Sequence, residues 1–393
     1  GWQFSQELRT AADLTDSIKL QVGGFYLKTH YDHFNSVRLE AFAPGLRQNL
    51  PQDQDNWSGS LFAQTYVDLT DQLRFQAGIR YTHEKTRMIA GTDNYINLAG
   101  GVGLYCTNEG SCGDTLLGGF RARGSESWDN VGWKLGLDYK VTNGTLLYAS
   151  WARGFKSGGF VGRVAQPQDL GPYNPEKVDT FEAGIKTDLF DRRLRLNFAG
   201  FYTNYRDMQV QQSYFLDGGT TIGTSIFNAA KAEIKGFELE ATALPVDGLT
   251  LTGSLAYLDA TYKAFNYLEP DGSFTNLSGR RLQNAPKWSA SAGAAYEFVL
   301  GSGKARVNWL YTYTDTKLLQ GLKGQPLVRI QPTNYLSANL GWTPDDERWS
   351  LEIWAKNLTD NRYVEAVTNN IGLFNQLSYT SPREYGVTFK FNL

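Results

Sequence analysis

The stretch EIKGFELEATALPVDGLTLTGSLAYLDATY, Glu233–Tyr262, carries the pattern that decides the fold. Apolar or small side chains recur at every second position on both sides of the sequence PVDG: Phe237, Leu239, Ala241 and Ala243 before it, and Leu249, Leu251, Gly253, Leu255 and Tyr257 after it. A period of two is typical of β-strands, and about ten residues suffice for a tilted strand to cross a bilayer. Because Asp-Gly favours a tight turn, we expect a hairpin of two membrane-spanning strands.

Composition agrees with this interpretation. The 393 residues include 41 glycines and 14% aromatic residues but only two cysteines. The sequence contains no run of 18 apolar residues, so no transmembrane helix is predicted. Neither a basic nor an apolar leader opens the chain, so we expect no signal peptide on it. The net charge of −2 argues against a nucleic-acid partner, which would need a basic face.

The same arrangement of strands and turns repeats along the chain. Seven short turns are predicted at 12–17, 68–72, 140–144, 189–193, 245–248, 300–304 and 343–348. Long polar segments lie between them, at 88–126, 154–177, 206–230, 263–285, 315–333 and 359–382. Short turns on one side and long connections on the other are typical of an outer-membrane barrel. With the final strand in REYGVTFKFNL, seven turns imply about fifteen strands, so the predicted fold is an all-β, transmembrane antiparallel β-barrel rather than a soluble β-sandwich.

The segment YASWARGFKSGGFVGR, Tyr148–Arg163, superficially suggests a phosphate-binding loop. Such a loop requires G-x-x-x-x-G-K-[ST] before a helix, and neither the order nor a helix is found here. We instead expect the end of a strand, with one face toward lipid (Leu147, Ala149 and Trp151) and the other toward the lumen (Tyr148, Ser150, Ala152, Gly154 and Lys156). Arg153 would then lie on the lipid side, where it would reach headgroup phosphates or mark a bulge.

Five motifs in order resemble TonB-dependent outer-membrane receptors, in particular the siderophore and pesticin-receptor-like branch. They are FSQELRT (4–10), YASWARGFKSGGF (148–160), NPEKVDTFEAGIKTDLFDRRLRLNFAGFYTNYRDMQVQ (174–211), NAAKAEIKGFELEA (228–241) and WAKNLTDNRYV (354–364). The resemblance implies a barrel of about twenty-two strands, closed by an N-terminal plug, that imports a scarce solute with energy from the TonB complex. It also implies the outer membrane of a Gram-negative bacterium, contact with outer-membrane lipid and lipopolysaccharide, and a ferric siderophore as the solute.

Taken with the resemblance, the strand count predicts that this chain is the C-terminal portion of such a barrel. About fifteen of twenty-two strands fall in residues 1–393, which we expect to form one barrel domain with no second domain. The resemblance implies that the plug and about seven strands are absent from it. An open sheet of this kind is not expected to be stable alone.

Candidate binding residues lie in the predicted outer connections. Lys156 and Arg163 would attract an anionic solute, with ordinary loop ion pairs as the alternative. Tyr214 and Phe215, near a predicted loop tip, would stack on an aromatic ligand or else pack within the loop. Cys106 and Cys112 in YCTNEGSC are expected to form a small disulfide, since the cell exterior is oxidising.

Catalytic, metal and cofactor sites are not predicted. HYDH (30–33) brings His30, Asp32 and His33 together, but without a fourth ligand we interpret them as exposed polar residues. Glu182, Glu238 and Glu240 alternate with apolar residues and are interpreted as lumen-facing rather than as paired acids. With no G-x-S-x-G and only three histidines, the protein is expected not to be an enzyme.

Two other classes remain open from the sequence. A passive porin would share the barrel but have fewer strands and an open lumen, and an outer-membrane lipase would need a nucleophile and base that we do not find. Within the receptor class, cobalamin, an oligosaccharide or an aromatic compound are alternatives to a siderophore, because loops determine the solute.

Overall fold

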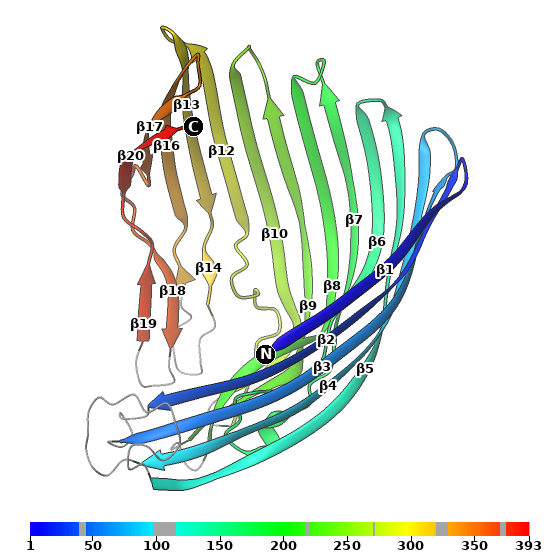
Figure 1. The fold of residues 1–393 in the computed structure, drawn as a ribbon, viewed down its shortest axis with the longest axis vertical. Helices are drawn as coiled ribbons and strands as arrows, with labels where there is room; N and C mark the ends of the chain where they lie inside the picture. The colour runs from blue at the N-terminus through cyan, green and yellow to red at the C-terminus, as the bar shows by residue number, and fades with distance from the viewer. Residues whose placement is uncertain are drawn as a thin grey trace.

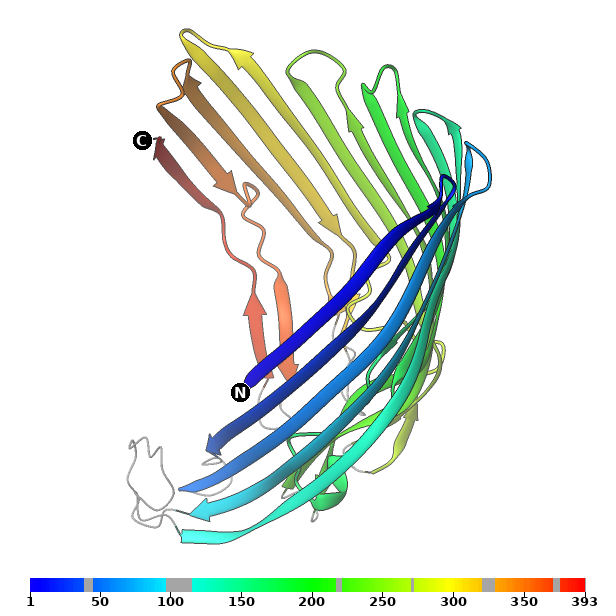
Figure 2. The same cartoon turned by 45° about the vertical axis from the view of Figure 1, so that its right-hand side comes forward.

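The structure, a computed structural model, describes residues 1–38, 45–96, 115–216, 221–269, 272–319, 329–369 and 375–392. One large antiparallel sheet curves into a trough that is open along one side (Figures 1 and 2). β1 and β20 form its two edges, and short turns join the strands at one end.

The sheet follows sequence order almost throughout. Its path contains fifteen strands, as expected: β1 (Trp2–Thr15), β2 (Ile18–Arg38), β3 (Leu46–Asp68), β4 (Leu73–Ile96), β5 (Thr115–Thr142), β6 (Thr145–Lys156), β7 (Glu176–Leu189), β8 (Leu194–Leu216), β9 (Thr221–Ala243), β10 (Leu249–Leu268), β12 (Trp288–Val299), β13 (Gly303–Thr314), β16 (Thr333–Pro344), β17 (Trp349–Lys356) and β20 (Glu384–Phe391). The short β11 (Phe274–Asn276) pairs with β10 off this path.

Two small sheets and one short helix complete the described chain. β14 (Lys317–Leu318) pairs with β15 (Arg329–Ile330), and β18 (Val364–Asn369) pairs with β19 (Asn375–Tyr379). η1 (Pro167–Leu170) is a single 3₁₀ turn. No helix in the described ranges is long and apolar enough to cross a membrane.

The hairpin of Glu233–Tyr262 has the predicted register. Phe237 faces Tyr257, Leu239 faces Leu255, and Ala243 faces Leu251 across β9 and β10. β20 pairs with β17 without a register shift, so Tyr385, Val387, Phe389 and Phe391 share one face, as the alternation predicts. All seven predicted turns connect consecutive strands of the path, because each contains residues that favour tight reversal.

The prediction that the intervening segments are long polar loops was wrong in several places. β8 and β9 continue through most of 206–230 and pair up to Leu216 and Thr221, and β4 and β5 extend to Ile96 and from Thr115. Polar residues do not interrupt these strands because the ladder is formed by the backbone and the outer ends of both faces meet water. The wall therefore rises well beyond a bilayer near β2–β5 and β8–β10.

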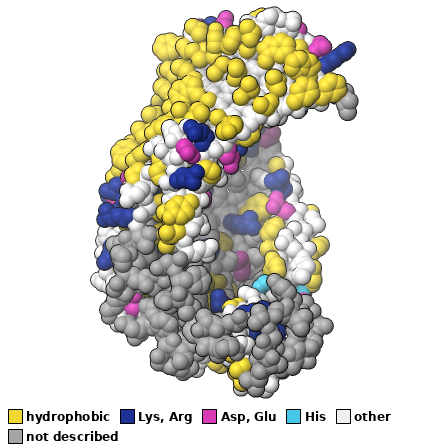
Figure 3. All heavy atoms as spheres, turned by 90° about the vertical axis from the view of Figure 1, so that its left-hand side faces the viewer, with side chains coloured by type: hydrophobic (Ala, Val, Ile, Leu, Met, Phe, Trp, Pro, Cys, Tyr) yellow, Lys and Arg dark blue, Asp and Glu magenta, His cyan; other side chains and the backbone are white. Residues whose placement is uncertain are grey.

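The two faces of the wall differ in chemistry. Exposed apolar side chains such as Leu61, Ile79, Leu137 and Phe181 share one face, while the alternate positions carry polar groups. Figure 3 shows hydrophobic side chains gathered toward the short turns and charged ones within the hollow. We take the apolar face as lipid-facing and the polar face as the inner wall.

Arg153 lies on the apolar face, as predicted, but it does not mark a bulge. It keeps continuous register with Trp133 on β5 and Asp179 on β7. Its Nε donates to Asp179 Oδ1 over 2.6 Å, and its guanidinium lies 3.9 Å from the Trp133 ring centroid. An ion pair and a cation–π contact therefore hold this charge in the regular sheet.

Candidate functional site

The candidate site lies on the inner wall at the long-strand end, where residues 157–175 leave β6 and return to β7. This segment is a compact loop rather than an extended one. Gly159 and Tyr173 exchange backbone hydrogen bonds of 3.0 and 2.9 Å, and the Val161 N–H donates to Leu170 O over 2.8 Å. Asp169 accepts from the Ala165 backbone N–H at 2.9 Å and so fixes the turn before η1.

An apolar cluster docks the segment against β4 and β5. Phe160, Val164 and Leu170 of the segment are buried with four wall residues, namely Met88, Ala90, Ala122 and Trp128. The Ser157 hydroxyl also donates to Glu84 Oε2 over 2.6 Å. The segment thus covers part of the inner wall instead of projecting outward.

Two glycines permit this docking. A Cβ on Gly158 would lie 2.5 Å from Trp128, and one on Gly159 would lie 2.5 Å from the Tyr173 hydroxyl. The glycine pair that resembled a phosphate loop is therefore explained by close packing. Burial, with a smaller contribution from the nearby Glu176 carboxylate, raises the pKa of Tyr173 above its usual range, so this hydroxyl stays protonated.

Glu176, which the sequence analysis did not single out, connects three strands beside this loop. It opens β7 and is almost fully buried, yet it accepts from the Gln209 backbone N–H at 2.6 Å and from the Tyr205 hydroxyl, both on β8. Lys156, at the end of β6, places Nζ 3.7 Å from Glu176 Oε1. Donors from two sides balance the cost of burying this carboxylate.

Lys156 remains available to a ligand despite that contact, since its side chain is 65% exposed. Arg163 is exposed on the docked segment, and no ion pair of its side chain occurs among the described residues. Both predicted cations therefore belong to the same connection between β6 and β7. Whether either contacts a solute stays a prediction.

The other predicted positions lie farther along the chain. The backbones of Tyr214 and Phe215 pair with Gly223 and Ile222 near the end of the β8–β9 hairpin. Cys106 and Cys112 fall outside the described residues, so the disulfide also stays a prediction.

Several buried polar groups of the inner wall near the docked segment have spare hydrogen-bonding capacity. Asn130, only 3% exposed, has neither amide atom paired, and Thr82 directly opposite has an unpaired hydroxyl. The indole N–H of Trp128 is likewise unpaired within the described chain. Such groups form hydrogen bonds with water or a solute when they are uncovered. Strand alternation predicts that they face inward, but only the tertiary structure shows that they are buried, Trp128 beneath the docked segment.

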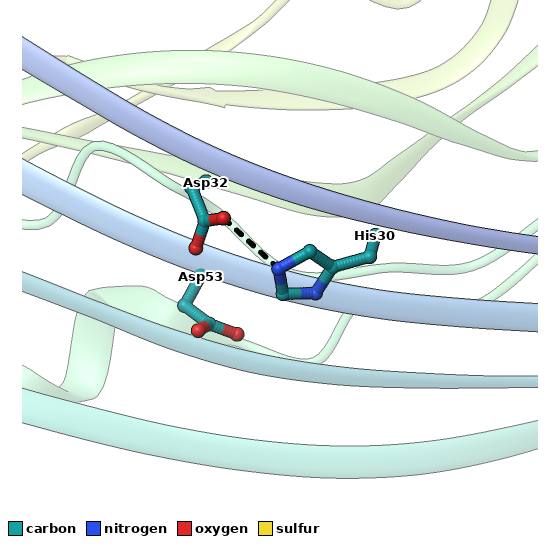
Figure 4. Close-up of side chains that lie close together, drawn as sticks. All are labelled: His30, Asp32 and Asp53. Carbon is teal, nitrogen blue, oxygen red and sulfur yellow. Dashed lines mark hydrogen bonds and ion pairs between the residues drawn. The ribbon is translucent and has the colours of Figure 1, made fainter. Parts of the chain in front are cut away.

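The histidine-containing stretch forms a cluster at the outer end of β2 and β3. Figure 4 shows His30, Asp32 and Asp53 close together, and their potential ligand atoms lie within 4.8 Å of one another. His30 Nε2 lies 3.0 Å from Asp32 Oδ2, and its Nδ1 lies 3.1 Å from Asp55 Oδ1. Since carboxylates occupy both ring nitrogens, the cluster is better explained as an ion-pair network than as a metal site.

Comparisons with known proteins agree with this geometry. The sequence model described as TonB dependent receptor-like, beta-barrel matches residues 1–358. The pesticin receptor of Yersinia pestis is 26% identical over 378 residues, which cover 92% of this chain and 47% of that receptor. The metal-pseudopaline receptor CntO of Pseudomonas aeruginosa is 26% identical over 243 residues, or 61% of this chain and 30% of that receptor.

Solved structures show the same fold. The ferric yersiniabactin uptake receptor FyuA from Yersinia pestis superposes with a TM-score of 0.76 at 20% identity, covering 99% of this chain and 54% of that one. The siderophore receptor PiuA from Acinetobacter baumannii superposes with a TM-score of 0.63 at 18% identity, covering 98% of this chain and 64% of that one. The chain thus spans about half or less of the curated relatives described above.

Proposed function

Because this chain belongs to the TonB-dependent receptor-like β-barrel family, whose members reside in the Gram-negative outer membrane, we propose that it is part of a receptor that imports a ferric siderophore. The observation that carries the proposal is the similarity to the pesticin receptor over 92% of the chain, together with the likeness to the ferric yersiniabactin uptake receptor FyuA over 99% of it. The siderophore specificity named for PiuA supports the same class of solute. No covalent chemistry is needed for this task, so the protein acts as a transporter and not as an enzyme.

The inner wall offers a way to attract such a solute. Many ferric siderophores are anionic, and the exposed Lys156 and Arg163 present positive charge beside the docked segment. Tyr214 and Phe215 would add aromatic surface from the β8–β9 hairpin. Residues 1–393 would serve as one barrel domain, and the TonB complex would act through a plug contributed by the rest of the receptor.

Growth and uptake measurements test the function. A strain lacking the whole receptor is expected to grow poorly under iron chelation and to lose uptake of one ferric siderophore from a panel of catecholate, phenolate and carboxylate types. Uptake of cobalamin and of an oligosaccharide is measured in the same strain for comparison. Normal growth under chelation, with loss of uptake of one of those solutes instead, would contradict the siderophore proposal.

Variants of the complemented receptor test the binding residues. We expect Lys156→Ala combined with Arg163→Ala to weaken binding of an anionic siderophore by about tenfold, because two long-range attractions are lost. Lys304→Ala is the matched control, since Lys304 is an exposed cation at the short-turn end. Equal effects of the two variants would show that these cations do not contact the solute.

A further inference from the structure

Arg80 of β4 is an inward-facing cation that is held in place without a carboxylate. It alternates with exposed apolar residues such as Ile79, so its side chain lies on the inner wall. Its guanidinium lies 5.6 Å from the ring centroids of both Phe25 and Phe62, and its Nη2 donates to Ser60 Oγ over 2.6 Å. Two cation–π contacts and one hydrogen bond orient this group, and its remaining N–H donors have no partner in the described chain.

Other arginines of the wall are held differently. Three of them each donate two hydrogen bonds to one aspartate: Arg74 to Asp68, Arg153 to Asp179 and Arg195 to Asp188. A guanidinium in such a pair has little capacity left for a ligand. Arg80 presents the same planar group, which matches a carboxylate at two points, but its side chain forms no ion pair within the described ranges. It can therefore bind a carboxylate that comes from outside the wall.

Lys134 of β5 adds a second cation to the same surface. Arg80 faces Gly132, and Lys134 lies two residues farther along β5, so the two cations are diagonal neighbours whose backbones lie about 7–8 Å apart. Lys134 is exposed and forms no ion pair with any residue that the structure describes. Small residues adjoin it on both sides, since Gly78 faces it on β4 and Ala152 faces it on β6. Two positive charges thus lie beside backbone that carries almost no side chain.

The carboxylates along these strands are distant and already hydrogen-bonded. Glu84 lies four residues from Arg80, about 13 Å along β4, and accepts from the docked segment. Asp138 lies four residues from Lys134, about 13 Å along β5, and accepts from Gln76 Nε2 over 2.6 Å. The next strand, β6, contains no acidic residue. Because these separations exceed the Debye length of about 8 Å, the two cations keep a local positive potential.

The Arg80–Lys134 surface lies between the outer opening and the short-turn end. The register of β5 and β6 places Lys134 four residues below Lys156, about 13 Å nearer the short turns. Above Arg80 on the same face, the buried Thr82 and Asn130 keep unpaired side-chain atoms. An anion drawn in by Lys156 therefore meets further polar groups and then two cations on its way inward.

We propose that the Arg80–Lys134 surface is a second solute site, where the carboxylates of a ferric siderophore bind during passage through the barrel. A guanidinium donates two parallel hydrogen bonds to a carboxylate, and the nearby ammonium adds a point charge. The site would therefore favour carboxylate-bearing complexes over catecholate complexes, which lack this planar acceptor. This inference rests on the proposed function, and it concerns transfer of the bound solute rather than its capture at the outer opening.

Transport by the whole receptor tests the site when capture and transfer are measured separately. The probes are iron-55 complexes of citrate, pyochelin and enterobactin, which represent carboxylate, phenolate–carboxylate and catecholate types. Arg80→Gln combined with Lys134→Gln is expected to slow the uptake of a carboxylate-bearing probe by about tenfold, because both attractions are lost. Binding of that probe to de-energised cells should stay within about twofold, since the outer connections are unchanged. Arg80→Lys, which keeps the charge but loses the planar fork, should give an intermediate rate.

Two controls accompany the site variant. Lys304→Gln combined with Arg306→Gln is the matched control, because it removes two exposed cations from β13 at the short-turn end. Entry of vancomycin reports whether the plug of the whole receptor has been loosened, and we expect none in either variant. Unchanged binding of the probe also shows that the variant receptor is folded.

Each result counts for or against the site. Slower uptake with unchanged binding, in the site variant only, supports the proposal. Unchanged uptake, equal slowing in the control, or parallel loss of binding and uptake would overturn it, and vancomycin entry would assign Arg80 to contact with the plug instead. If the unchanged receptor imports only a carboxylate-free siderophore, the carboxylate site is wrong while the siderophore proposal stands. Import of cobalamin or an oligosaccharide, with no siderophore, would instead remove the proposed function itself.

Discussion

The two ends of the barrel wall are built in different ways. At the short-turn end, each reversal closes on itself: Thr15 Oγ1 accepts from the Ile18 N–H at 3.0 Å, and Thr70 Oγ1 accepts from the Leu73 N–H at 2.9 Å. At the long-strand end, residues far apart in sequence hold the connections, as when Ser157 contacts Glu84, 73 positions away. The first end is therefore determined by local chemistry and the second by packing across the wall.

This difference implies that the two ends respond separately to mutation. A change at a turn affects one hairpin, whereas a change beneath the docked segment affects several strands at once. The following predictions, made for the whole receptor, run from the largest expected effect to the smallest.

Replacement of Glu176 by alanine is expected to disturb the long-strand end most. It leaves the Gln209 N–H and the Tyr205 hydroxyl without their acceptor, at a cost of about 1–3 kcal/mol for each buried donor. Hydrogen exchange of residues 157–177 should accelerate while the turns stay protected. Glu297→Ala, at a half-exposed position near the turns, is the control, and equal exchange in both variants would contradict the distinction.

Gly158→Val is expected to undock residues 157–175. The new side chain would meet the Trp128 ring and Tyr173 O, and overpacking of this kind costs about 1–3 kcal/mol. Limited proteolysis within the segment and the fluorescence of Trp128 report the change. Gly154→Ala, where a Cβ meets nothing within 4 Å, should leave both readouts as they are. If residues 157–175 resist proteolysis in Gly158→Val as they do in the unchanged protein, the packing around Gly158 accommodates the larger side chain and the prediction is contradicted.

Gly248→Ala tests the short-turn end. Gly248 has a φ of +81°, and an added Cβ would lie 2.2 Å from Glu297 O, so we expect a loss of about 1–2 kcal/mol confined to the β9–β10 turn. Denaturant unfolding measures the loss, and exchange at 157–177 should be unchanged. Gly253→Ala in the same hairpin is the control, because its nearest neighbour would be 3.9 Å away. Faster hydrogen exchange at 157–177 in Gly248→Ala would show that the two ends are coupled and would contradict the prediction.

The smallest effect concerns acid pH at the loop after β17. Asp360 Oδ1 accepts from the Arg383 backbone N–H at 2.9 Å, and this bond holds the pKa of Asp360 below its ordinary value of 3.8. Because the pKa of Asp360 is lower in the folded state, the ionised carboxylate stabilises the loop at pH values above its ordinary pKa. This stabilisation is lost as the pH falls through the lowered, folded-state pKa. Exchange near Arg383 should therefore rise in strong acid and become less pH-dependent in Asp360→Asn. The same pH profile in both proteins would refute this assignment.

Much of the fold was predictable because its signals are local. Strand alternation in Glu233–Tyr262 and in Tyr385–Phe391, and turn residues such as Asp247-Gly248, act within a few positions of one another. From them followed the strand count, the antiparallel order and the placement of Leu147 and Trp151 opposite Tyr148 and Lys156. The polar content of 206–230 misled the prediction of strand ends because a strand above the membrane has no need of apolar residues.

The candidate site was predictable only in part. Lys156 and Arg163 could be proposed from charge and position. By contrast, the residues adjacent in sequence to Glu176, Tyr205 and Asn130 form no pattern that would identify these three as part of a site. Their roles depend on burial and on contacts between different strands. The grouping of Arg80 and Lys134 likewise depends on the register of β4 and β5.

The sequence by itself determined the β-barrel class, the number of strands and the side of the wall that each strand residue faces, because backbone pleating imposes a period of two. Only the tertiary structure decided where the β6–β7 connection docks, which carboxylates are buried and how the inward cations of β4 and β5 are grouped. These features arise from contacts between strands distant in sequence, and such contacts leave no periodic pattern along the chain.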